Sequence, residues 1–530
     1  MDQRLLSAAF AAAILCAPTT AQDLKLHAAD YAADDLFGAA VSVSGNVALV
    51  GARRHDEGGE NKGAAYLFNA TTGTQIAKLS ASDGEAYDYF GCSVSIEGDS
   101  AVIGARWDDV NGDNSGSAYV FDVTTGLLRT KLVPIDGAED DAFGHAVAIS
   151  GETALVGTYT SSGAGAAYLF DINSGVQLAK LTPSDGLNND RFGSAVAINA
   201  TTAVVGSKEH DEFGQASGAV YIFDLATGDE IQKITPSDGA EHDNFGCAVA
   251  ISGDVLLIGA DSHAGTGAAY LFDLSSGVEN KLSAADGASG DRFGAAVAIR
   301  GSSLVIGAPW SNQAGTASGA AYVYTVAGTQ LFKLLSSGGA TGDEFGSAVS
   351  LSGAAALIGA KRHDYDGQID AGSAYLMAPV DCNGNGLADS YDISSGASQD
   401  CDLNGTPDEC QLEDNDCNED GVPDGCEADC DNDGVPDSCQ ASADCNDNGV
   451  PDSCDISEDL ESDEDADGIP DSCQESDSGG GGSSGGGCGI IPVSGPPSGM
   501  DLFEHYAGLL LLLILVPRLH RARKAQSVRA

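Results

Sequence analysis

The sequence predicts an all-β fold in which one four-stranded unit is repeated seven times. A Phe-Gly pair recurs about every 50 residues, and a glycine follows each of these phenylalanines by 14 positions. An aspartate stands two positions before each phenylalanine, and a lysine stands 12 positions before it. The segments between these residues are short alternating or apolar runs bounded by glycine, aspartate and serine, a pattern typical of strands. Four antiparallel strands repeated with this period predict a seven-bladed β-propeller.

Each predicted blade begins at its Phe-Gly pair. In the fifth copy the four strands are FGCAVAI, DVLLIGA, AAYLFD and VENKL, in chain order. Tight turns such as SGN and SGD join the first and second strands, and turns such as TTG and SSG join the third and fourth. The seven phenylalanines are Phe37, Phe90, Phe143, Phe192, Phe245, Phe293 and Phe345.

The seventh copy lacks a fourth strand, because the chain continues from Tyr375 into MAPVDCNGNG. The segment LKL at residues 24–26 has the composition of a fourth strand, and Lys25 keeps the 12-residue spacing to Phe37. We therefore expect this N-terminal strand to complete the seventh blade and to close the ring. Closure would remove the open strand edges between the first and last blades.

The segment FGAAVAIRGSSLVIGAP at residues 293–309 resembles the FG-GAP repeat. Repeats of this family build the seven-bladed propeller at the head of integrin α chains and of many bacterial surface proteins. The resemblance covers residues 24–378 and implies a propeller domain over residues 22–378. In integrins, some blades carry a calcium loop between the first and second strands. Here that connection is a short turn in every copy, so calcium is not expected at that place.

The topology predicts which face of the propeller binds a ligand. Because neighbouring strands alternate in direction, the second-to-third loops and the fourth-to-first connections emerge together on one face. The second-to-third loops vary in length and chemistry, as in RRHDEGGENKG and PWSNQAGTASG. Variable loops on a rigid fold often carry recognition. We expect a protein or glycan ligand on this face.

Four histidines share one position, four residues after the repeat glycine: His55, His210, His263 and His363. They either converge on a site that binds metal or moves protons, or belong to a polar turn that was duplicated with the repeat. The seven aspartates before the Phe-Gly pairs are predicted to cap turns.

Two loops have alternate-residue oxygen spacing and are candidate calcium sites. One contains Asp109, Asn111 and Asp113, and the other contains Asp364 and Asp366. Cys92 and Cys247 follow Phe-Gly pairs in non-adjacent blades, so we expect two buried thiols without a bridge.

The sequence predicts a second region, of different composition, at residues 381–474. Residues 381–477 contain 32 Asp and Glu and no Lys or Arg. Six segments place oxygen-bearing side chains at positions 1, 3, 5 and 9 of one frame, with glycine at position 6, and some add an acid at position 12. This is the pattern of a calcium loop. A disordered acidic linker would not maintain it. The predicted Ca²⁺ ligands are Asp381, Asn383, Asn385, Asp389, Asp392, Asp400, Asp402, Asn404, Asp408, Asp416, Asn418, Asp420, Asp424, Glu427, Asp429, Asp431, Asp433, Asp437, Asp444, Asn446, Asn448, Asp452, Asp455, Asp463, Asp465, Asp467 and Asp471.

Ten cysteines fall within these loops, and the combination resembles thrombospondin type 3 repeats. In that family, calcium and disulfides replace a hydrophobic core, so the resemblance implies an irregular, disulfide-rich calcium-loop stalk. Spacing alone does not determine the connectivity. A sequential pairing is one hypothesis, with bridges Cys382–Cys401, Cys410–Cys417, Cys426–Cys430, Cys439–Cys445 and Cys454–Cys473.

The two ends of the chain predict export and anchoring. Residues 1–21 have the layout of a secretory signal peptide, with an internal apolar helix as the alternative. A Gly/Ser/Pro-rich linker at residues 475–500 precedes residues 501–530, which combine an apolar run with a basic tail. This end resembles bacterial C-terminal sorting signals; a plain membrane anchor with a free thiol at Cys488 is the alternative. We expect an exported protein at the cell surface or outer envelope, anchored in the membrane at least transiently.

The formal net charge of −55 excludes nucleic acid as a partner and favours cations. Together these features predict a non-enzymatic binding head for adhesion or protein recognition on a calcium-stabilised stalk. An alternative is a propeller enzyme, because AYVFDVTTGLLRTKL resembles strands of quinoprotein dehydrogenases. Trp107 and Trp310 are both in loops, however, where they cannot act as the packed blade tryptophans of that family. A structural surface-layer component is a further alternative.

Overall fold

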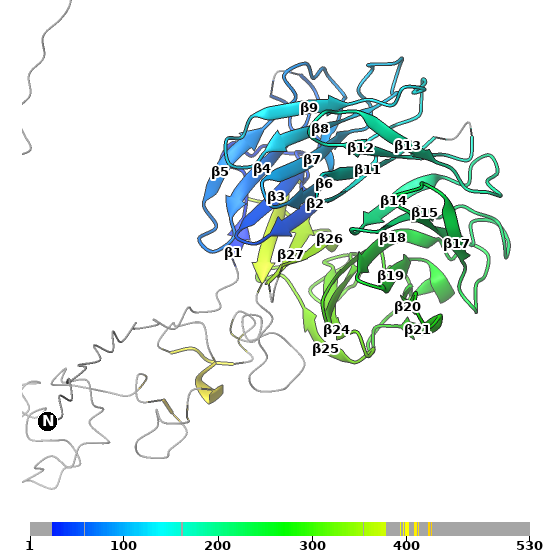
Figure 1. The fold of residues 1–530 in the computed structure, drawn as a ribbon. Coiled ribbons are helices and arrows are strands. Elements are labelled where there is room, and N and C mark those ends of the chain that lie inside the picture. Colours follow the sequence, from blue (N-terminus) through cyan, green and yellow to red (C-terminus); the bar gives the residue numbers. More distant parts are fainter. Residues whose placement is uncertain are drawn as a thin grey trace, which may run out of the picture.

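The computed structural model describes residues 24–377 except 58, 161–162 and 353–354, and also residues 393, 396, 398–401, 407–410, 412, 422–423 and 426. The predicted signal peptide, linker and C-terminal segment, and most of the predicted stalk, lie outside the described residues. The described chain forms seven antiparallel four-stranded sheets arranged around a ring (Figure 1). The predicted all-β, seven-bladed propeller is confirmed.

Each of the first six blades is a sheet of four strands hydrogen-bonded in chain order. Blade 1 contains β2 (Phe37–Ser44), β3 (Val47–Ala52), β4 (Ala64–Asn69) and β5 (Gln75–Leu79). Blade 2 contains β6 (Phe90–Glu97), β7 (Ser100–Ala105), β8 (Ser117–Asp122) and β9 (Leu128–Leu132). Blade 3 contains β10 (Ala146–Ser150), β11 (Thr153–Gly157), β12 (Ala167–Asp171) and β13 (Gln177–Leu181).

Blade 4 contains β14 (Phe192–Ile198), β15 (Thr202–Ser207), β16 (Ala219–Asp224) and β17 (Glu230–Ile234). Blade 5 contains β18 (Phe245–Ser252), β19 (Val255–Ala260), β20 (Ala268–Asp273) and β21 (Val278–Leu282), with a short 3₁₀ helix η1 (His263–Gly265) between β19 and β20. Blade 6 contains β22 (Ala296–Arg300), β23 (Ser303–Ala308), β24 (Ala320–Thr325) and β25 (Gln330–Leu334). Blade 7 contains β26 (Phe345–Ser352), β27 (Ala355–Ala360), β28 (Ser373–Met377) and β1 (Leu24–Leu26).

The N-terminal strand closes the ring as predicted. Strand β1 pairs antiparallel with β28, and Leu24, Lys25 and Leu26 lie opposite Leu376, Tyr375 and Ala374. In Figure 1, β1 therefore lies beside the last blade, near the label β27. The first strands of neighbouring blades contact one another around the ring, including β2 with β26.

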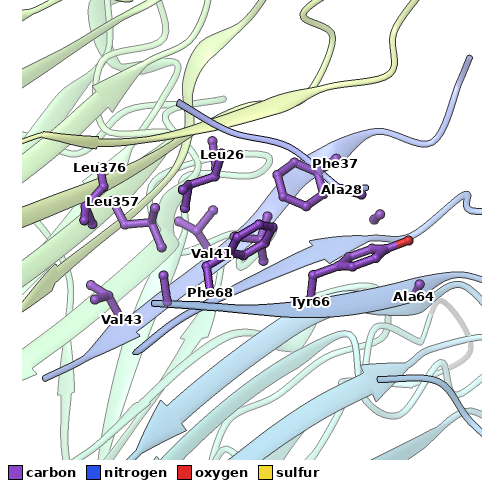
Figure 2. Packing of buried hydrophobic residues seen from close by; sticks show 14 residues of the cluster. Leu26, Ala28, Phe37, Val41, Val43, Ala64, Tyr66, Phe68, Leu357 and Leu376 are labelled. Carbon is purple, nitrogen blue, oxygen red and sulfur yellow. The ribbon is translucent and has the colours of Figure 1, made fainter. Parts of the chain in front are cut away.

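The hydrophobic core is divided among the junctions between blades. Seven clusters of buried side chains each combine residues from two neighbouring blades. Figure 2 shows the junction between blades 7 and 1, where Leu26 and Leu376 pack near Val41 and Phe68. Because each core lies between blades, a missing strand at one junction exposes apolar surface on two blades.

The glycines of the repeat allow neighbouring blades to meet backbone to backbone. A Cβ atom at Gly51 would lie 2.1 Å from the carbonyl oxygen of Gly91 in the next blade, closer than real Cβ contacts. The ring closes with the same contact, because a Cβ atom at Gly359 would lie 2.0 Å from the carbonyl oxygen of Gly38. Gly38 also has a φ of +87°, which side chains other than glycine rarely adopt. The Phe-Gly pairs and the repeat glycines therefore mark the contacts between blades.

The direction of the strands gives the propeller two different faces. Tight hairpins lie on one face, which we call the hairpin face. The second-to-third-strand loops and the fourth-to-first-strand connections lie on the other, which we call the loop face. Strand β28 runs from the loop face toward the hairpin face and pairs antiparallel with β1. The chain therefore enters at Leu24 and leaves after Met377 on the hairpin face.

The described part of the stalk corrects one prediction. Cys401 forms a disulfide with Cys426, 25 residues away. The sequential pairing of Cys401 with Cys382 and of Cys426 with Cys430 is therefore wrong. Between the two cysteines, the 3₁₀ helix η2 (Asp408–Cys410) brings Asp408 to the backbone N–H of Cys401, at 3.0 Å. This contact explains why the bridge skips neighbouring cysteines, because the turn folds the chain back on Cys401.

Truncation of Leu26 tests the closure of the ring. Leu26 is 1% exposed within the core between blades 7 and 1, so Leu26→Ala should lower the free energy of unfolding by about 2–4 kcal/mol. Leu178→Ala is the matched control, because Leu178 lies on an outer strand and is 56% exposed. Its expected effect is within about 0.5 kcal/mol. Equal midpoints for both variants in denaturant titrations of the full chain would contradict a closing role for β1.

Candidate functional site

The loop face is held together by seven aspartates, those that stand two residues before the Phe-Gly pairs; all are buried except Asp141, which is partly buried. Each carboxylate accepts a hydrogen bond from the backbone N–H three residues earlier, at 2.7 to 2.9 Å. This geometry fixes the connection that leads into each first strand, and the prediction of turn caps is confirmed. The aspartates are Asp35, Asp88, Asp141, Asp190, Asp243, Asp291 and Asp343.

The four histidines do not converge on one site. Each is buried in its own blade, and its Nδ1 contacts the capping aspartate at 2.8 to 3.1 Å. Its Nε2 contacts the lysine of the fourth strand of the same blade, at 2.5 to 2.9 Å. The histidine therefore connects three loops and strands of one blade, in agreement with the interpretation as a duplicated polar turn. The four pairs of histidine and lysine are His55 with Lys78, His210 with Lys233, His263 with Lys281, and His363 with Lys25.

A second set of aspartates, seven residues before the phenylalanines, holds these lysines. In blades 1 to 6 the Nζ atom of the fourth-strand lysine lies 2.5 to 2.8 Å from the carboxylate of this aspartate. In all seven blades the same Nζ atom lies 4.9 to 5.8 Å from the ring centre of the third-strand tyrosine. The sequence analysis missed these aspartates, although their fixed spacing could have revealed them. They are Asp30, Asp83, Asp136, Asp185, Asp238 and Asp286.

Blade 7 is the exception, because Gly338 stands where the other blades have this aspartate. Within the described residues, Lys25 has no carboxylate partner; it contacts His363 at 2.6 Å and lies 5.2 Å from the ring centre of Tyr365. His27 stacks on Tyr365, with ring centres 4.1 Å apart. Burial lowers the pKa of Lys25, whereas the nearby charge of Asp343 opposes this shift. The closing strand is thus held by ring contacts and a histidine instead of an ion pair.

Two groups on the loop face have the composition of a metal site. Asp30, His55 and Glu57 offer ligand atoms within 4.8 Å of one another, and so do Asp185, His210 and Glu212. In both groups a lysine ammonium already contacts all three side chains: Lys78 in the first and Lys233 in the second. Burial opposes the charge of Lys233, but its bonds to Asp185 and Glu212 outweigh this effect and raise its pKa. The ammonium therefore takes the place that a metal cation would need.

Blade 2 has an aspartate where four other blades have the histidine. Asp108 contacts Lys131 at 2.6 Å and accepts hydrogen bonds from Ser117 and Tyr119, both at 2.7 Å. Burial, together with the charges of Asp108 and Asp109, raises the pKa of Asp88 to about 6. A pocket of about 270 Å³ lies beside these residues and is lined by Asp83, Glu85, Asp88, Asp108, Asp109, Val110 and Lys131.

In the two predicted calcium loops of the propeller, Asp109, Asp364 and Asp366 accept hydrogen bonds from within the protein. Asp109 accepts a hydrogen bond from the backbone of Asn114 at 2.7 Å, and the side chain of Asn111 donates to Pro134 at 3.3 Å. In blade 7, Asp364 accepts from the backbone of Asp370 at 2.9 Å, and Asp366 accepts from the Tyr31 hydroxyl at 2.8 Å. Calcium binding at these loops stays a prediction.

The remaining candidate residues are the two cysteines of the propeller and the predicted calcium ligands of the stalk. Cys92 and Cys247 are free thiols, as predicted, but both are partly rather than fully buried. Of the predicted calcium ligands of the stalk, only Asp400 and Asp408 are described; the others lie outside the described residues. Asp408 lies close to Cys401 and Cys426, whose disulfide excludes a thiolate metal site there.

Among the described residues, the exposed large aromatic side chains all lie on the loop face, whereas the hairpin face exposes aliphatic side chains such as Leu127 and Val176. Both tryptophans of the chain lie on the loop face, Trp107 with 36% and Trp310 with 40% of the residue exposed. Six further large apolar residues are exposed on the same loops and connections: Tyr87, Val110, Ile135, Leu187, Phe213 and Ile369.

Replacement of a blade lysine tests whether its ammonium occupies a latent metal site. Lys233→Ala leaves Asp185, His210 and Glu212 without their cation, so the variant should be less stable than the parent. Zn²⁺, which accepts histidine and carboxylate ligands, should then raise its melting temperature by roughly 3 °C or more at saturating metal. Lys281→Ala is the control, because its lysine contacts only Asp238 and His263. An equal response to Zn²⁺ in both variants and the parent would show binding elsewhere on the acidic surface.

A model of the FG-GAP repeat matches residues 20–68, 74–121, 128–170, 176–223, 229–272, 277–324 and 329–377. The matched segments cover more than half of the chain, and each spans the fourth strand of one blade and the first three strands of the next, beginning with the closing strand β1. A search of the curated proteins finds no match. In the described part of the chain, none of the helices has the length and apolar character to cross a membrane. With seven matched repeats forming one closed propeller, the chain belongs to the FG-GAP repeat family.

Proposed function

We propose that this protein is a non-enzymatic binding protein of the cell surface, whose loop face recognises a protein or glycan ligand. The observation that carries this proposal is the gathering of exposed apolar and aromatic residues on the loop face. Tryptophan, tyrosine and arginine are enriched among the residues that dominate binding energy at protein interfaces. Trp107 and Trp310 are such residues, and Phe213 is another aromatic residue of the kind enriched at interfaces; all three lie in loops that differ between blades.

The route of the chain supports the same assignment. Both ends of the propeller chain, at Leu24 and Met377, lie on the hairpin face. The segments that would anchor the protein therefore start on the side opposite to the exposed aromatic residues. A head attached in this way leaves its loop face free for a partner.

We also propose that residues 381–474 form a calcium-stabilised stalk and that residues 501–530 anchor the exported protein. The disulfide between Cys401 and Cys426 supports export, because disulfides persist in oxidising compartments. Residues 381–477 contain 32 acidic residues and no Lys or Arg, so a divalent cation is needed to offset their repulsion. Calcium, which takes six to eight oxygen ligands, suits the repeated frame.

Ligand screening with matched variants tests the recognition face. The immobilised full chain is screened against a glycan array and a displayed-peptide library, and each hit is measured again with the double variant Trp310→Ala, Phe213→Ala. We expect this variant to lose about tenfold or more in affinity, because buried aromatic contacts contribute 2 kcal/mol or more each. The control is Leu127→Ala, Leu178→Ala, which truncates two exposed residues away from the loop face. A ligand whose affinity falls in the control variant but not in the aromatic variant would show that recognition takes place outside the loop face.

Limited proteolysis tests the stalk. With calcium bound, residues 381–477 of the full chain should resist cleavage, and a chelator should expose them because few apolar side chains remain to hold the loops together. The propeller serves as the internal control, since its hydrophobic junctions do not depend on calcium. If chelation leaves the cleavage pattern of residues 381–477 unchanged, the calcium assignment is wrong.

A further inference from the structure

The inner rim of the loop face carries a cluster of positive charge in a protein whose net charge is −55. We call this cluster the basic rim and define it as Arg53, Arg106, Arg191 and Lys208. Arg53, Arg106 and Lys208 stand two residues after the repeat glycines of blades 1, 2 and 4, and Arg191 directly precedes Phe192. Arg53, Arg106 and Lys208 begin the loops between the second and third strands, and Arg191 lies just before a first strand. The first strands are the strands nearest the propeller axis.

The ring of Tyr159 brings part of the basic rim together: Arg191 and Lys208 lie 4.1 Å and 5.2 Å from its centre, and His145, which directly precedes β10, stacks on it at 4.3 Å. Burial and the charges of Arg106, Lys208, Arg53 and Arg191 lower the pKa of His145 to about 3. The imidazole is therefore neutral at physiological pH, and its Nδ1 has no hydrogen-bond partner among the described residues. Cations from blades 1, 2 and 4 thus surround one neutral imidazole of blade 3 with positive charge.

The charges of the basic rim are mostly unpaired. Within the described residues, Arg53, Arg106 and Lys208 form no ion pair, and the Nε atoms of Arg53 and Arg106 are buried without a hydrogen-bond partner. Arg191 is the exception, because it contacts Glu209 at 2.9 Å. Mutual repulsion and burial lower the pKa of Arg53, with burial as the larger cause. An anion at this place would relieve the repulsion.

The opposite side of the inner rim differs, because its cations have carboxylate partners. Lys361 contacts Glu344 at 2.7 Å, and Arg362 contacts the same carboxylate at 3.1 Å. Arg292 lies 3.8 Å from Asp261. The repeat therefore provides equivalent positions in several blades, but Arg53, Arg106 and Lys208, in blades 1, 2 and 4, have no carboxylate partner among the described residues.

Aromatic rings hold the cations of the basic rim in place. The guanidinium of Arg106 lies 5.2 Å from the ring centre of Trp107 and 5.6 Å from that of Tyr89. The guanidinium of Arg191 lies 4.1 Å from the ring centre of Tyr159, on which His145 also stacks, at 4.3 Å. Cation–π contacts fix the planes of the guanidinium groups and leave their edges to bind carboxylates.

We propose that the basic rim binds an acidic peptide segment of a protein partner through its aspartate or glutamate carboxylates. This inference rests on the proposed function and names the ligand class of the loop face. A peptide is favoured over an acidic glycan because arginine side chains already cover faces of Trp107 and Tyr159, which sugar rings would need for stacking. The total negative charge of the protein does not prevent binding, because charges beyond about 8 Å are screened at physiological salt.

Binding of an octaglutamate peptide to the full chain tests the inference, with octaglutamine as the uncharged control probe. Isothermal titration at physiological salt should detect binding of octaglutamate only. Arg106→Gln and Lys208→Gln should each weaken it about tenfold, because hydrogen bonds to charged groups contribute about 1.5–3 kcal/mol. Arg300→Gln is the matched control, because Arg300 is exposed at the end of β22 on the hairpin face. Unchanged melting temperatures would show that the variants remain folded.

Three outcomes would overturn the inference. They are absence of octaglutamate binding, an equal loss of affinity with Arg300→Gln, and tighter binding of a heparin hexasaccharide than of octaglutamate. If octaglutamate fails while ligands found by screening still depend on Trp310 and Phe213, the acidic-peptide inference is wrong and the proposed function stands. If both fail, the loop face is not the recognition surface.

Discussion

The structure depends on the closure of a ring whose hydrophobic cores lie between blades. No blade buries its apolar side chains within its own sheet, because each cluster combines residues of two neighbours. The junction of blades 7 and 1 is complete only when Leu26, which belongs to the first strand of the chain, packs with Leu357 and Leu376 of the last blade (Figure 2). Closure links the two ends of the domain, so all seven junctions share the same packing and no sheet edge remains open there.

This closed ring explains why polar residues recur on the loop face. Each blade must fix two loops against its outer strand. Blades 1 to 6 do so with a lysine, a tyrosine and two aspartates, blade 7 has Gly338 in place of one aspartate, and in four blades a histidine joins the group. These charges satisfy one another and hold the loops in place. The repeated polar residues are therefore structural, and the residues that differ between blades are left to determine what is bound.

The differences between blades are concentrated at the inner rim and the loop tips. Among the described residues, the unpaired Arg106 of blade 2 and Lys208 of blade 4 lie beside aromatic rings, whereas Arg292 and Lys361 near blades 6 and 7 are paired with carboxylates. Asp108 replaces a histidine in blade 2 and produces an acidic pocket. One fold thus presents regions of opposite charge on a single face, which favours recognition of a specific partner over general attraction.

The sequence by itself determined the strands, the seven blades, the capping aspartates and the displaced closing strand, because each depends on spacings that repeat along the chain. The sequence also showed that four histidines share one position of the repeat. It could not show that Lys78 and Asp30, 48 residues apart, contact each other beside His55. Only the tertiary structure decided this contact, the grouping of Arg53, Arg106, Arg191 and Lys208 around His145, and the pairing of Cys401 with Cys426. The physical reason is that these contacts join segments that approach one another only after the ring closes or the chain turns back. The periodic pattern of the sequence therefore cannot predict them.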